Sequence, residues 1–83
     1  MTTVERVRAF IVDNFYVEDG QVPPDEASLL ELGVVDSTGV LEVIAFLQDE
    51  LGVKVEDREI LPENLDSIAN IAAFVARKRA DAA

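Results

Sequence analysis

The sequence predicts an all-α fold: a small bundle of three long helices plus one short helix, with a long loop between the first and second helices. Three segments carry apolar residues at the three- and four-residue steps that mark one face of a helix. A glycine and a pair of prolines interrupt the chain between the first two of these segments, so no continuous helix can run there. A chain of 83 residues has the length of one domain built around a single core.

The first helix is expected from Thr3 to Val17. Thr2 and Glu5 have the spacing of a capping box, in which each side chain accepts a hydrogen bond from the other residue's backbone N–H. The apolar stripe that would face the core consists of Val4, Val7, Ile11 and Phe15.

Residues 18–36, EDGQVPPDEASLLELGVVD, are expected to form the long loop, because Gly20 and the Pro23-Pro24 pair exclude a helix. Connections of this length are usually functional or ordered by their own side chains. The residues available to pin this loop onto the core are Leu29, Leu30 and Leu32.

A second helix is predicted from Ser37 to Leu51, followed by Gly52 as a left-handed C-terminal cap. Helical spacing gives it an apolar inner face of Val40, Val43, Ile44, Leu47 and Leu51. Its outer face consists of Thr38, Leu41, Glu42, Ala45, Gln48 and Asp49. That outer face is either ordinary surface or a docking helix, whose charges steer a partner while its apolar centre makes the contact.

The predicted short helix lies at about residues 62–65, and the last helix begins near Asp66 or Ser67. The residues expected to face inward from the last helix are Ile68, Ile71, Ala72 and Val75. Three basic residues, Arg77 to Arg79, are placed in its final turn, where positive charge suits the helix dipole.

The composition is strongly acidic, with 17 Asp and Glu against 7 Lys and Arg and a net charge of −10. Such a surface repels a nucleic-acid backbone and favours partners with basic patches, so no nucleic-acid partner is expected. No apolar stretch approaches the roughly 20 residues that span a bilayer, and the N-terminus does not have the pattern of a leader peptide. We therefore expect a cytoplasmic protein with no membrane partner. We also expect a monomer.

The usual metal-binding patterns are missing from the sequence. It has no cysteine and no histidine, which excludes a disulfide framework and a zinc site of the ordinary ligand types. A calcium-binding loop also fails in the segment that begins at Asp13, because Phe15 and Glu18 stand where an acid or amide and a glycine are required.

Ser37, at the start of the second helix, has three candidate roles. It could cap the helix together with Asp36, since either side chain can accept from a free backbone N–H. A hydrolytic nucleophile is disfavoured, because VDSTG lacks the first glycine of Gly-x-Ser-x-Gly and the chain has no histidine to act as base. The third role is modification by another enzyme, because a helix N-terminus favours a phosphoester on its serine. Asp36 would oppose that product by repulsion, which points to recognition by the modifying enzyme.

The segment ELGVVDSTGVLEVIAFLQDELGVKVEDREILPENLDSIANIAAFVARK resembles an acyl carrier protein, most strongly between Leu32 and Leu51. The shared features are the leucine-rich loop, the Leu-Gly-x-x-Asp-Ser motif, the acidic second helix and the closing apolar helix. The resemblance implies that residues 1–83 form a single carrier domain and not an enzyme. It also implies that Ser37 carries phosphopantetheine from coenzyme A, with cargo held as a thioester.

The resemblance further assigns a docking surface. The residues it implies in partner docking are Asp36, Glu42 and Asp49, which would meet basic residues, and Thr38, Leu41 and Ala45, which occupy the apolar contact positions. The implied partners are a phosphopantetheinyl transferase, an acyl-activating ligase or acyltransferase, and a ketosynthase or other acyl-processing enzymes. The pathway would be fatty-acid, polyketide or related specialised biosynthesis.

Two alternatives share these features: an aminoacyl or peptidyl carrier, and an unmodified acidic interaction module in which Ser37 only caps. Three positions depart from many fatty-acid carriers, which have leucine and then an acid after the serine where this chain has Thr38 and Gly39, and often an acid at Gln48. These departures favour a dedicated set of partner enzymes, with Gly39 shaping the partner-facing first turn.

Overall fold

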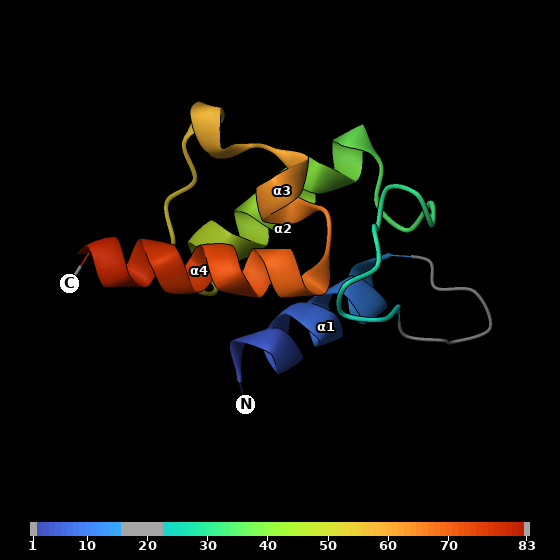
Figure 1. Ribbon diagram of the computed structural model, residues 1–83, viewed down its shortest axis with the longest axis horizontal. Helices are drawn as coiled ribbons and strands as arrows, with labels where there is room; N and C mark the ends of the chain where they lie inside the picture. Colours follow the sequence, from blue (N-terminus) through green and yellow to red (C-terminus); the bar gives the residue numbers. More distant parts are fainter. Residues whose placement is uncertain (1, 16–22, 83) are drawn as a thin grey trace.

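The computed structural model describes residues 2–15 and 23–82, and within them it forms only helices, turns and loops, which confirms the all-α prediction (Figure 1). The elements in chain order are α1 (Thr3–Asn14), α2 (Ser37–Asp49), a 3-10 turn η2 (Asp57–Glu59), α3 (Pro62–Leu65) and α4 (Ile68–Ala82). Helix α4 packs against both α1 and α3 (Figure 1). None of the described helices combines the length and the hydropathy needed to cross a bilayer.

Helix α1 begins with the predicted capping box. The Glu5 N–H donates to Thr2 Oγ1 over 3.1 Å, and the Thr2 N–H donates to Glu5 Oε1 over 3.0 Å. Hydrogen bonding from Thr2 to the Glu5 carboxylate, first of all from the Thr2 backbone N–H, lowers the pKa of Glu5. The helix ends at Asn14, earlier than the predicted Val17, because Phe15 has extended backbone angles and Asn14 Nδ2 bonds the Phe10 carbonyl of the last turn. Val17 itself lies outside the described residues.

The core is built from the inner faces of the three long helices and from the loops between them. The largest side chains with essentially no exposure are Ile11, Leu29, Leu47, Ile68, Ile71, Val7, Val43 and Val75. The predicted inner face of α2 is confirmed, with Val40 partly buried and the other four residues buried. The helix stops at Asp49, two residues before the predicted end, and Gly52 has the expected positive φ of 67°.

Only one of the three loop leucines pins the loop to the core. Leu29 is 1% exposed, whereas Leu30 and Leu32 are 43% and 55% exposed. The difference follows from the turn at Gly33, whose φ of 73° reverses the chain so that the Val34 and Val35 N–H groups both donate to the Leu29 carbonyl. Of the three leucines available to pin the loop, only Leu29 is buried in the core.

Helices α3 and α4 follow the prediction closely. Ser67 Oγ accepts from the Asn70 N–H at the start of α4, and three of the four predicted inward residues are buried, while Ala72 is only partly so. Phe74, which the prediction did not place inward, is 2% exposed. Because α4 continues to Ala82, only Arg79 of the three basic residues lies in its last turn.

Candidate functional site

Ser37 is the first residue of α2, and its side chain is exposed. The residue that caps the helix is Asp36, whose Oδ1 accepts the Gly39 N–H over 2.7 Å. Within the described part of the chain, the Ser37 hydroxyl makes no hydrogen bond. Of the two capping candidates in Asp-Ser, the structure therefore assigns the cap to Asp36 and leaves Ser37 free for chemistry.

The residues before Ser37 hold it in place through buried contacts. Val35 is 2% exposed, and the Val35 N–H donates to the Leu29 carbonyl over 3.2 Å. The chain thus enters the helix from an anchored position at Val35, and the next two residues, Asp36 and Ser37, are exposed. An anchored backbone fixes the position at which the exposed Ser37 side chain meets an approaching molecule.

Asp66, between α3 and α4, fastens the long loop from the other side. Its Oδ1 accepts the Leu30 N–H over 2.9 Å, its backbone carbonyl accepts the Leu29 N–H over 2.7 Å, and Oδ2 accepts the Ser28 hydroxyl. These partners are separated by 36 to 38 residues in sequence. Sequence reasoning missed this clamp, because no local pattern links an aspartate after one helix to a loop that far away.

The three serines of the chain differ sharply in environment. Ser28 donates to Asp66 and its oxygen also accepts the Glu31 N–H. Ser67 is 4% exposed and caps α4. Ser37 alone combines exposure with a hydroxyl that is free of hydrogen bonds to the described residues.

Gly39 has a different role from the partner-facing one that the sequence suggested. It is buried, and a Cβ atom at this position would lie 2.7 Å from Phe15 Cε1 and 3.2 Å from Val35 Cγ1. Real Cβ atoms essentially never approach a neighbour as closely as the first of these distances. Glycine at this position therefore lets the ring of Phe15, just after α1, pack beneath the turn that carries Ser37.

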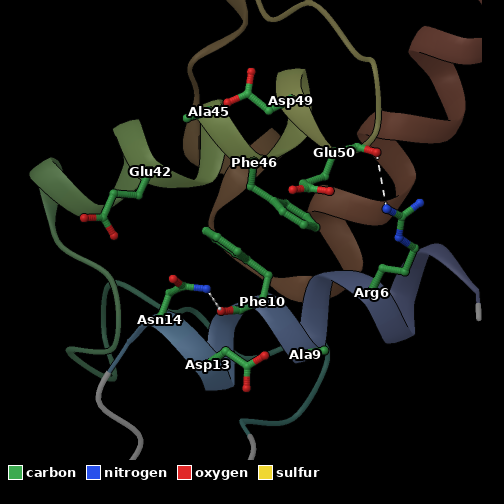
Figure 2. A pocket seen from close by; sticks show the side chains of 10 residues that line it. All are labelled: Arg6, Ala9, Phe10, Asp13, Asn14, Glu42, Ala45, Phe46, Asp49 and Glu50. Carbon is green, nitrogen blue, oxygen red and sulfur yellow. Dashed lines mark hydrogen bonds between the residues drawn. The ribbon is translucent and has the colours of Figure 1, made fainter.

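The predicted outer face of α2 is confirmed as surface. All six of its residues are exposed, and Leu41 is 63% exposed. Glu42, Ala45 and Asp49 also border a groove of about 670 Å³ between α1 and α2 (Figure 2). This α1–α2 groove is lined by Arg6, Ala9, Phe10, Asp13, Asn14, Glu42, Ala45, Phe46, Asp49 and Glu50.

A second, smaller cavity of about 90 Å³ lies beside the start of α2, and sequence reasoning did not anticipate it. Its walls come from the loop, α2 and the region of α3: Leu30, Val35, Val40, Ile60, Leu61, Pro62, Leu65 and Asp66. All but the last are apolar, so the cavity suits a small apolar group. The described residues contain no cluster of acids that could hold a metal ion.

Known proteins share this pattern across most of the chain. Residues 5–75 match a family model described as "Phosphopantetheine attachment site". A protein named "Acyl carrier protein" from Solidesulfovibrio magneticus is 27% identical over 81 residues, which cover 98% of this chain and 100% of the relative. Another "Acyl carrier protein", from Akkermansia muciniphila, is 32% identical over 71 residues, which cover 86% of this chain and 85% of the relative.

Proposed function

Because the chain belongs to the acyl carrier protein family and so carries covalently attached phosphopantetheine, we propose that Ser37 is the residue to which this group is attached. The observation that carries the proposal is that Ser37 is the one serine with an exposed hydroxyl free of hydrogen bonds to the described residues. It also directly follows the Leu-Gly-x-x-Asp segment.

The first turn of α2 suits a phosphoester. The Gly39 N–H donates to Asp36 Oδ1, and the Val40 N–H donates to the Asp36 backbone carbonyl over 3.0 Å. The N–H groups of Ser37 and Thr38 have no acceptor among the described residues. Those two donors and the positive end of the helix favour a phosphate on Ser37, and they offset the repulsion from the Asp36 carboxylate.

The bound group supplies a thiol that holds an acyl chain as a thioester, and the protein supplies the surface that partner enzymes recognise. A phosphopantetheinyl transferase that transfers the group from coenzyme A must reach Ser37 from solvent, which the exposed first turn permits. The anchored Val35 and the cap at Asp36 keep that turn formed while the transferase binds. On this proposal the chain is a carrier and not a catalyst.

The outer face of α2 is the proposed docking surface. Asp36, Glu42 and Asp49 would attract basic residues of partner enzymes, while Thr38, Leu41 and Ala45 would make the apolar contact. Asp36 would contribute even though it caps the helix, because the structure shows a bond only to its Oδ1.

The changes Glu42→Lys and Asp49→Lys should slow loading by partner enzymes, because they lower the rate of association. Added salt should shrink the difference from wild type. A defect that salt does not change would contradict electrostatic docking.

The proposed cargo is an acyl intermediate of fatty-acid, polyketide or related specialised biosynthesis. The cavity beside α2 supports acyl over aminoacyl cargo, because all of its lining residues except Asp66 are apolar, and both carboxylate oxygens of Asp66 already accept hydrogen bonds from the loop. The partners would then be an acyl-activating ligase or acyltransferase, followed by a ketosynthase or other acyl-processing enzymes. The site of action would be the cytoplasm.

Loading of the modified protein tests this assignment. The chain is first treated with a broad-specificity phosphopantetheinyl transferase and coenzyme A, and is then offered a malonyl transferase or an aminoacyl-adenylating enzyme. Intact mass should show a hydroxylamine-sensitive acyl group in the first case and none in the second. Loading by the aminoacyl enzyme alone would establish the peptidyl-carrier alternative, and failure of the first modification would leave the acidic interaction module.

A further inference from the structure

The α1–α2 groove is held open by a pair of aromatic rings. Phe10 of α1 and Phe46 of α2 stack with their centroids 4.2 Å apart and their planes within 14° of parallel, between the two helices (Figure 2). Phe15 meets Phe10 edge-on at 5.9 Å and continues this row toward Gly39. Because the row is packed against the core, the spacing of α1 and α2 is set before any partner arrives.

The groove has a strong excess of negative charge. Four carboxylates lie along it, those of Asp13, Glu42, Asp49 and Glu50, against one guanidinium, that of Arg6. Arg6 donates to the Glu50 backbone carbonyl over 3.2 Å and not to a carboxylate. Figure 2 shows Asp13 on the α1 side, with Glu42 and Asp49 on the α2 side.

Five of the six lysines and arginines outside the groove are bonded to groups that also lie outside it. Three form ion pairs, Arg8 with Asp25, Arg58 with Glu56 and Lys78 with Glu59. Two others donate to uncharged oxygens: Arg77 to the side chain of Asn64 and Arg79 to the backbone of Leu51. No ion pair among the described residues involves the four groove carboxylates, so they are available to the cations of a partner.

The chemistry of the groove selects the kind of molecule. Phosphates, nucleic acids and anionic lipid surfaces would be repelled, and the described acids form no cluster that could hold a metal ion. A guanidinium fits best, because it pairs with carboxylates through several N–H groups and also stacks on aromatic rings, and both groove phenylalanines are only partly buried. Because the carboxylates lie along two helices, a protein segment with more than one cation can pair with several of them at once.

The grounds for the proposal are the stacked rings of Phe10 and Phe46, the excess of carboxylates in the groove and its open volume. From them we infer that the α1–α2 groove receives an arginine-bearing segment of a partner enzyme, and that Asp13 on α1 is part of the recognition surface. This inference rests on the proposed carrier function for the identity of the partner. It extends the docking surface from α2 onto α1, since Glu42, Ala45 and Asp49 border both.

The test uses a synthetic helical peptide with three arginines on one face, titrated into the ¹⁵N-labelled protein and followed by NMR. The amides of Ala9 and Asp13 should shift together with those of Ala45 and Asp49. Asp13→Asn should weaken binding about two- to five-fold, as expected for one exposed ion pair. Its matched control is Glu63→Gln, which removes an exposed acid of α3 outside the groove and should bind as wild type does.

A second pair of variants tests occupancy directly. Ala9→Arg places a guanidinium in the groove from within the chain and should weaken peptide binding by at least about ten-fold. Ala9→Gln, whose side chain is polar, uncharged and shorter, should change binding little. Shifts confined to the outer face of α2, with the α1 amides unmoved, would overturn the inference, as would equal affinities of Asp13→Asn and Glu63→Gln. Intact-mass analysis of Ser37 modification in the same variants keeps the outcomes separate, because loss of the carrier function would leave peptide binding unchanged.

Discussion

Replacing Gly39 by alanine should reveal the contact that supports the turn carrying Ser37. Alanine is favoured over glycine in a helix by up to about 1 kcal/mol. The new Cβ would, however, lie 2.7 Å from Phe15 Cε1, and that ring is held by its edge-on contact with Phe10. Overpacking of this kind costs about 1–3 kcal/mol. The clash should exceed the propensity gain, so Gly39→Ala should lower the free energy of unfolding by about 0–2 kcal/mol.

The effect of Gly39→Ala on the free energy of unfolding should change sign when the ring of Phe15 is removed. In a Phe15→Ala background, only the contact with Val35 at 3.2 Å remains tight, and Gly39→Ala should stabilise by up to about 1 kcal/mol. Urea unfolding of the wild type, both single variants and the double variant measures the four free energies, and the coupling should be about 1–3 kcal/mol. A Gly39→Ala effect of the same sign and size in both backgrounds would refute the role of Phe15.

Three further predictions concern stability. Leu47→Ala, at a site with 0% exposure, should cost about 2–5 kcal/mol on urea unfolding, whereas Leu41→Ala should stay within about 0.5 kcal/mol; equal losses would mean that the inner and outer faces of α2 are wrongly assigned. Asp36→Ala should cost about 1 kcal/mol through loss of the cap, while Ser37→Ala should be nearly neutral, and a reversed order would contradict the capping geometry. The Lys78 ammonium lowers the pKa of Glu59 below 4.5, so the stability that Glu59→Gln removes is present in full above pH 4.5 and is lost as the pH falls through the lower folded pKa. Urea midpoints between pH 7 and 3 should therefore converge for wild type and this variant, and a constant gap would contradict it.

The features that local sequence could predict were those set by neighbouring residues. The capping box of Thr2 and Glu5 spans three positions, and the inner face of α2 follows from helical spacing alone. The left-handed Gly52 likewise follows from glycine at a helix end. Ser37 stood out for the same reason, because its motif is contiguous.

The features that escaped prediction depend on contacts between distant segments. The Asp66 clamp joins residues 36 to 38 positions apart, and the closeness of Phe15 to Gly39 appears only once α1 and α2 are packed. The early end of α1 has the same origin, because Phe15 leaves the helix and packs onto the core. Gly39 was thus recognised as unusual but assigned the wrong neighbour: sequence shows that a side chain is missing, and only the fold shows what occupies its place.

The most direct test of the central claim is to locate the phosphopantetheine on the chain. Wild type and Ser37→Ala are each incubated with a phosphopantetheinyl transferase and coenzyme A. Their intact masses are measured by mass spectrometry, and the proteins are then digested for peptide mapping. The wild type should gain the mass of one phosphopantetheine group, on the peptide that contains Ser37, while Ser28 and Ser67 remain unmodified because both are engaged in hydrogen bonds. The Ser37→Ala protein should remain folded and gain nothing. A full phosphopantetheine mass on that variant, or on a peptide without residue 37, would contradict the account.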